Sequence, residues 1–306
     1  MKKTLVLIAV VVPTGIAVGA VDAVFGRVLL YLGAVRDAHT AWFLPFLGLI
    51  GALMAWAYKR YGAGCENGMG MVFEAGHAER EAIPLRLVPF VICATWLTHL
   101  FGGSAGREGV AVQLAAAPEW SAELALELTA LGIVFGLTGA AFAFCLKRAK
   151  KLAQNRLKNP VLRALVMGVA LSAVLYLLYR GRYCGLGTNL INASLAGEPI
   201  YAWDWALKLA LTVLTLSAGF QGGEVTPLFS VGASLGAALA GLLGLPAAFC
   251  AALGYAAVFG SATNTLLAPA LIGAEVFGWA AAPHFFAVCA LAYAVNGGRS
   301  IYSGQK

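Results

Sequence analysis

The chain has 306 residues and a mass of 31.8 kDa. It is 60% hydrophobic and only 11% charged, with a mean hydropathy of +0.81, which excludes the polar surface of an ordinary soluble domain. The net charge of +7 comes from basic residues at the ends of apolar runs, as lipid headgroups and the positive-inside rule would place them, and this argues against nucleic-acid binding. Continuous apolar runs also exclude a transmembrane β-barrel. We therefore expect a multi-pass, all-α membrane protein.

Apolar segments of uneven length follow one another along the chain and predict its membrane helices. They span residues 4–33, 41–58, 84–101, 129–146, 161–179, 205–220, 228–244, 246–260, 265–281 and 284–296. A helix needs about 20 apolar residues to cross a bilayer, so several segments are too short to cross alone. We expect segment 4–33 to be a retained helix and not a cleaved signal peptide. Uneven helices broken by glycine are typical of a transporter or channel.

Two glycine-rich strings between these segments resemble each other. Residues 102–109 read GGSAGREG and residues 222–227 read GGEVTP, and a short apolar helix is expected after each. Glycine permits the tight turn, and an acidic residue stands at or near each helix start. A buried helix start exposes N–H groups and the positive end of the helix dipole. Two such starts aimed at one point would bind an anion such as fluoride or chloride.

The order of the motifs resembles the CLC family of chloride channels and anion/proton antiporters. Gly106-Arg107-Glu108-Gly109 comes first, residues 223–227 follow, and Tyr302 stands in the final Gly-Arg-Ser-Ile-Tyr. The resemblance runs from the first helix to the last. It implies an inverted-repeat bundle of tilted and broken helices, multi-pass in a bacterial inner membrane, and a homodimer with one pathway in each subunit.

Two motifs are similar to those of the fluoride-exporting subgroup of that family. Met69 stands where chloride members carry serine, and the later motif has Glu224 and Thr226 where chloride members read Gly-x-Phe-x-Pro. The resemblance implies fluoride/proton antiport that exports fluoride. A passive, voltage-gated-type chloride channel and an inactive deleted copy stay open as alternatives.

The resemblance also implies roles for single residues. Glu108 is expected to gate the anion site and to carry protons, and Glu224 to take part in proton passage, with helix capping as the alternative for each. The uncharged donors Thr226 and Tyr302 suit an ion that must bind and then leave; local capping is the alternative for Thr226. Met69 would line the pathway or pack in the core. The full set expected around the anion is Met69, Gly106, Gly109, Val110, Val225, Thr226 and Tyr302.

We expect one CLC-type transmembrane domain over residues 1–306, with a shortened first half at 1–127 and a second half at 128–306. After Gln113 about three helices of the family are missing, because only a short acidic stretch through Glu127 precedes the next apolar segment. Their loss should expose apolar faces. No cofactor, metal or nucleic acid is expected, since the six cysteines show no CxxC spacing and no enzymatic motif is present. The expected partners are a halide, protons, the lipid bilayer and a second subunit.

Overall fold

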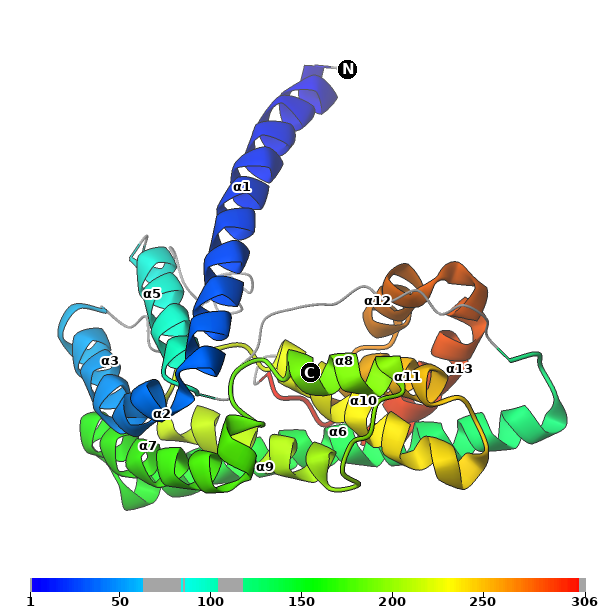
Figure 1. Ribbon diagram of the computed structural model, residues 1–306. Helices are drawn as coiled ribbons and strands as arrows, with labels where there is room; N and C mark the ends of the chain where they lie inside the picture. Colours follow the sequence, from blue (N-terminus) through cyan, green and yellow to red (C-terminus); the bar gives the residue numbers. More distant parts are fainter. Residues whose placement is uncertain (1, 63–83, 85, 104–117, 303–306) are drawn as a thin grey trace.

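The computed structural model describes residues 2–62, 84, 86–103 and 118–302 (Figure 1). Every regular element in these ranges is a helix, which confirms the all-α prediction. The long helices are α1 (Lys2–Ala38), α3 (Leu47–Tyr61), α5 (Leu87–Leu100), α6 (Ala122–Arg156), α7 (Pro160–Leu177), α8 (Thr188–Ala196), α9 (Asp204–Ala218), α10 (Val225–Leu243), α11 (Ala247–Thr263), α12 (Leu267–Phe277) and α13 (Ala282–Asn296). Short elements are α2 (Thr40–Phe43), η1 (Leu44–Phe46), η3 (Tyr179–Gly181) and η4 (Trp279–Ala281).

The helices are as uneven in length as the sequence predicts. Within the described ranges, five stretches are long and apolar enough to cross a membrane: Thr40–Tyr61, α6, α7, α10 and Trp279–Asn296. The apolar helices α5, α11 and α12 are shorter. Helix α6 has 35 residues and is about 50 Å long, so it extends beyond the hydrocarbon layer. Helix α8 was not predicted, because its sequence TNLINASLA carries too little apolar character.

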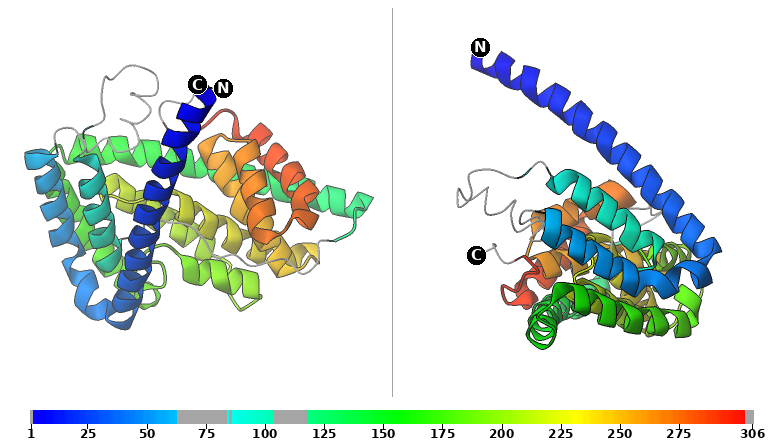
Figure 2. Two further views of the ribbon diagram at one scale, coloured as in Figure 1. Left: turned by 90° about the horizontal axis from the view of Figure 1, so that it is seen from above. Right: turned by 90° about the vertical axis from the view of Figure 1, so that its left-hand side faces the viewer.

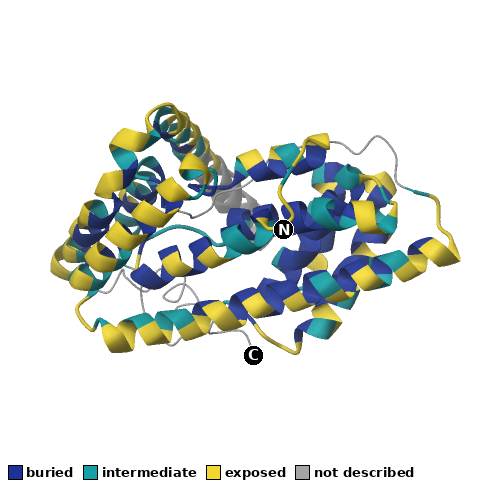
Figure 3. Cartoon of the chain, turned by 60° about the horizontal axis from the view of Figure 1, so that its bottom comes forward, coloured by how far each residue is buried: buried dark blue, intermediate teal, exposed yellow. Residues whose placement is uncertain are grey.

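The larger of two apolar cores is formed by helices α6 and α9–α13 (Figure 3). Its centre is the crossing of α10 and α11, where Gly232 faces Gly254. A Cβ atom on Gly232 would lie 2.0 Å from the carbonyl oxygen of Gly254, so only glycine permits this approach. One turn later Gly236 meets the backbone of Cys250 in the same way. Small residues therefore let these two helices pack backbone to backbone.

The smaller core joins α3, α5 and α7 to the chain around Tyr183. Helix α1 contacts α5 at its C-terminal end, and its N-terminal end extends away from the other helices (Figures 1 and 2). Helix α9 belongs to both cores, because Leu211 packs in the smaller one and Val213 in the larger. Helix α7 lies after residue 128 but packs on α3, so helices of the two predicted halves contact each other; the division at residue 128 stays a prediction.

Candidate functional site

The second glycine-rich string forms the turn between α9 and α10. Gly219 ends α9 with a φ of +100°, a conformation that favours glycine. Glu224 stands at the N-cap of α10 but its side chain makes no capping hydrogen bond. Pro227 follows in the first turn, where a missing N–H is tolerated. The first N–H groups of α10 have no acceptor within the helix. They lie at the helix start, beside the half-buried Glu224 and the buried Thr226.

Two buried hydroxyl groups continue from this helix start along one face of α10. Thr226 and Ser230 are four residues apart and fully buried, and neither side-chain oxygen has a hydrogen-bond partner among the residues that the structure describes. Ser194 Oγ on α8 is likewise without a described partner, whereas Ser234 Oγ bonds to Ser230 O at 2.6 Å and Thr215 Oγ1 to Leu211 O at 2.7 Å within their own helices. A buried hydroxyl normally finds such a partner, so Thr226 and Ser230 have capacity left for a ligand.

The chain after α13 folds back onto the C-terminal end of α11. Gly297 and Gly298, with φ of +68° and +71°, turn the backbone. Ile301 N then donates to Ala262 O at 2.9 Å, and Ser300 Oγ donates to Thr263 O at 3.2 Å. The same Ser300 oxygen accepts the backbone N–H of Tyr302 at 3.1 Å. These bonds anchor the backbone at Tyr302. Without such bonds, a segment near the end of a chain is often poorly ordered.

Glu224 and Tyr302 lie within electrostatic reach of each other although they are far apart in sequence. Burial, and after it the nearby Glu224 carboxylate, raises the pKa of the Tyr302 phenol to about 12. The phenol therefore keeps its proton at physiological pH and remains a hydrogen-bond donor. The structure thus brings Glu224, Val225 and Thr226, at one helix start, together with Tyr302.

The first glycine-rich string is described as far as Gly103. Gly103 O accepts the backbone N–H of Gly185 at 3.2 Å, and a Cβ atom on Gly187 would lie 2.5 Å from Ser230 Oγ. The turn at residues 185–187 therefore links the beginning of the first string to the hydroxyl face of α10. Met69, Gly106, Glu108, Gly109 and Val110 lie outside the described residues, and their roles stay predictions.

A buried polar cluster holds this turn in place. Asp204, which is fully buried, accepts hydrogen bonds from Arg182 Nη2 at 2.7 Å and from Tyr183 Oη at 2.6 Å. The bond to Asp204 raises the pKa of Arg182, and burial raises the pKa of the Tyr183 phenol. Lys208, also fully buried, donates to Gly185 O at 2.6 Å and to Tyr183 O at 3.1 Å. Asp204 and Lys208 therefore hold the backbone of residues 182–185, which precedes α8, in place.

No described group of His, Cys, Asp and Glu side chains is arranged to hold a metal ion. The chemistry that this arrangement permits is the reversible binding of an ion by backbone N–H groups and neutral hydroxyls.

Comparison with known proteins identifies the family. The model of the voltage gated chloride channel family matches residues 50–119 and 117–297, which is most of the chain. The chain belongs to the CLC family. A chloride/fluoride channel protein of Pseudomonas syringae pv. tomato is 29% identical over 381 residues, which cover 94% of this chain and 83% of that protein. The family predicted from the motifs is therefore confirmed.

Solved CLC structures share the fold. The crystal structure of a CLC-type fluoride/proton antiporter is 39% identical and matches with a TM-score of 0.94 over 95% of both chains. A slow cyanobacterial Cl⁻/H⁺ antiporter, 15% identical, matches with a TM-score of 0.76 over 95% of this chain and 93% of its own. These similarities confirm the predicted CLC-type fold and a multi-pass membrane protein that transports anions and is not an enzyme.

The family match also locates a break in this CLC chain. The two matched segments meet at residues 117–119, a few residues after Gln113, where the sequence predicts missing helices. The alignment with the Pseudomonas protein extends over 381 residues, more than the 306 of this chain, so that relative contains residues with no counterpart here.

The sequence analysis missed three features of this CLC site: Ser230, Lys208 and the start of α8 at Gly187. The four-residue spacing from Thr226 would have placed Ser230 on the same helix face. Lysine is almost never fully buried without a partner, and Lys208 stands inside an apolar segment, which was a usable signal. The contact of Gly187 with α10 had no signal in the sequence, because it depends on the packing of α8.

Proposed function

We propose that this CLC protein is a fluoride/proton antiporter that exports fluoride. The observation that carries the proposal is the buried start of α10, where the Thr226 hydroxyl has no hydrogen-bond partner among the described residues and Glu224 acts electrostatically on Tyr302. The 39% identity to a CLC-type fluoride/proton antiporter supports the same conclusion.

The anion would bind to groups that carry no full positive charge. The N–H groups at Val225 and Thr226 point out of the helix start, and the Thr226 hydroxyl and the Tyr302 phenol can donate hydrogen bonds. Gly106, Gly109 and Val110 would complete the site from the first glycine-rich string, and Met69 would line it. Because neutral donors hold an ion less tightly than a cation does, the ion can also leave.

Two carboxylates would couple the anion to protons. In its ionised form Glu108 would occupy the anion site itself, and when protonated it would withdraw and admit fluoride. A part for Glu224 in proton passage is supported by its half-buried side chain, which makes no capping bond and acts electrostatically on Tyr302. The two groups would together couple proton movement to anion movement.

A passive anion channel is the second candidate. The family model is that of a voltage gated chloride channel, and the Pseudomonas relative is named a chloride/fluoride channel protein. A third candidate, an inactive copy, is supported by the break at residues 117–119, which agrees with a first half shortened within residues 1–127.

A homodimer in a bacterial inner membrane completes the proposal. Helix α12 is apolar, yet Glu275 is exposed on it beside the exposed Leu271. A carboxylate that faces lipid is costly, and a second subunit on this face would shield it.

Transport by the purified protein in liposomes tests the proposal. We expect fluoride efflux accompanied by proton uptake, and loss of proton coupling in Glu108→Ala. Thr226→Val should reduce fluoride transport about tenfold or more, because a hydrogen bond to a charged group contributes about 1.5–3 kcal/mol. Thr215→Val is the matched control, since its hydroxyl bonds only to its own helix. Flux that ignores a proton gradient would favour the channel, and no flux from the wild type would favour the inactive copy.

A further inference from the structure

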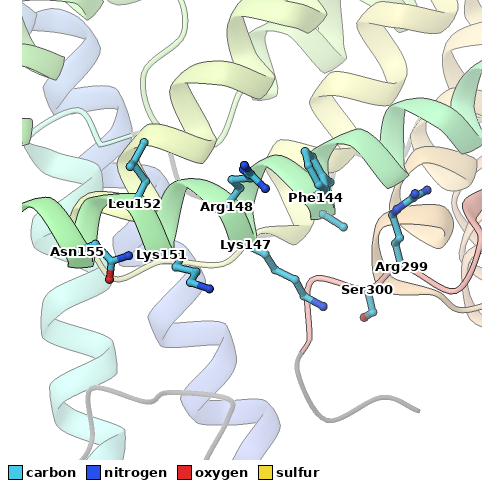
Figure 4. Close-up of a pocket in the computed structure, with 9 residues that line it drawn as sticks. Phe144, Lys147, Arg148, Lys151, Leu152, Asn155, Arg299 and Ser300 are labelled. Carbon is cyan, nitrogen blue, oxygen red and sulfur yellow. The ribbon is translucent and has the colours of Figure 1, made fainter.

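A pocket of about 610 Å³ lies where the C-terminal part of α6 meets the chain that follows α13 (Figure 4). Its lining is Ala143, Phe144, Lys147, Arg148, Lys151, Leu152, Asn155, Arg299 and Ser300. None of the proposed transport roles uses this pocket.

Among the described residues, four cations line the pocket and no carboxylate does. Lys147, Arg148 and Lys151 come from α6 and Arg299 comes from the chain after α13, and all four are exposed. In the part of the chain that the structure describes, none of the four forms an ion pair. Four cations around one cavity create a positive potential that attracts an anion with more than one oxygen, such as a phosphate group.

The pocket also has an apolar side. Figure 4 shows Phe144, Arg148 and Leu152 along one side of α6, and Lys147, Lys151 and Asn155 along another. Phe144 is 53% exposed and Leu152 is 57% exposed. Since α6 is long and apolar enough to span the membrane and these residues lie in its last turns, the pocket is expected at the depth of the lipid headgroups. A free phosphate would leave the exposed apolar side chains unused.

We propose that this pocket binds an anionic phospholipid, with the headgroup phosphate among Lys147, Lys151 and Arg299 and an acyl chain against Phe144 and Leu152. A bound headgroup would also restrain the segment that carries Tyr302, because Ser300 lines the pocket and its Oγ accepts the N–H of Tyr302 at 3.1 Å. The binding proposal does not depend on the transport function.

Binding can be measured on the full chain in an uncharged detergent. The purified protein is titrated with a short-chain phosphatidylglycerol, with the matching phosphatidylcholine and with inorganic phosphate, and bound lipid is counted by native mass spectrometry. We expect saturable binding of phosphatidylglycerol, with little binding of the other two. The triple variant K147Q/K151Q/R299Q should bind at least tenfold more weakly, because each cation contributes about fivefold.

The matched control variant K59Q/R60Q/K158Q removes the same charge from exposed positions outside the pocket. It should bind within about twofold of the wild type. An equal loss in both variants would show general surface attraction and overturn the proposal, as would absence of saturable binding. Inorganic phosphate that binds as well as the lipid would overturn the lipid assignment.

Hydrogen exchange gives a second measurement that needs no ion flux. Phosphatidylglycerol should slow exchange at residues 299–302 in the wild type but not in the triple variant. Unchanged exchange despite saturable binding would place the lipid elsewhere and overturn the proposal.

Discussion

The two apolar cores of this CLC protein differ in how completely their helices are enclosed. In the larger core, 67% of the α10 span is buried, whereas in the smaller core only 28% of the α7 span is buried. Both cores use glycine at a helix crossing: Gly232 with Gly254 in the larger and Gly48 with Gly168 in the smaller. Close approach alone therefore does not distinguish them. The difference is in what covers the other faces of the helices.

The smaller core contains α5, the last described helix before residues 104–117, whereas α6, the first helix after them, packs in the larger core. Exposed apolar side chains such as Leu30, Tyr31 and Leu177 stand on α1 and α7; Leu126 and Leu242 are exposed in the same way on α6 and α10. The candidate anion site, in contrast, is built on the enclosed α10. We therefore expect substitutions at helix crossings to cost more in the enclosed core than in the open one.

Asp204→Ala should have the largest effect, because the fully buried Asp204 links Arg182 and Tyr183 to the start of α9. It leaves the partly buried Arg182 and the buried Tyr183 without their common acceptor. We expect a loss of about 4 kcal/mol in the free energy of unfolding, measured by denaturant titration in mixed micelles. Asp37→Ala, which removes an exposed partner of Arg36, is the control and should lose about 1 kcal/mol or less. Equal losses would contradict the linking role of Asp204.

Gly232→Ala tests the enclosed core. The added Cβ would meet a backbone oxygen at 2.0 Å, and the helices cannot move apart without opening the core. The free energy of unfolding should fall by about 3 kcal/mol in the same titration. Gly241→Ala, on the exposed side of α10 with open space around it, should change it by about 1 kcal/mol or less.

Gly48→Ala makes the corresponding change in the open core. Its Cβ would lie 2.7 Å from Val169 N, but α7 has lipid-exposed faces and can shift outward. We expect a loss of about 1–2 kcal/mol, smaller than for Gly232→Ala. A loss as large as that of Gly232→Ala would show that the open core is as rigid as the enclosed one.

Tyr302→Phe should leave stability at neutral pH nearly unchanged and act on anion binding. The pKa of Tyr302 in the folded protein, about 12, lies above the ordinary value of 10, so the wild type loses stability as pH rises from about 10 to 12. The variant should lack this loss in thermal unfolding scans. Its fluoride transport should fall about tenfold with an unaltered pH profile between pH 5 and 9, because the phenol is protonated throughout that range. A changed profile in that range would contradict the assigned role.

The sequence by itself determined the solvent, the helices and the family. In lipid, a long apolar run can satisfy its backbone N–H and C=O groups only as a helix. The motifs are short contiguous stretches of sequence. The helices and the family can therefore both be predicted without knowledge of the tertiary structure. The predicted segments agree with the long helices, apart from the polar α8.

Only the tertiary structure decided what surrounds the candidate site. It placed Tyr302 near Glu224, Ser230 against Gly187, and α7 on α3. The members of each pair are distant in the sequence, or they meet only because two helices cross. Helix periodicity assigns a residue to a face of its own helix, but it carries no information on which neighbour that face meets. That choice follows from close packing of whole helices, where glycine positions such as Gly232 select the partner.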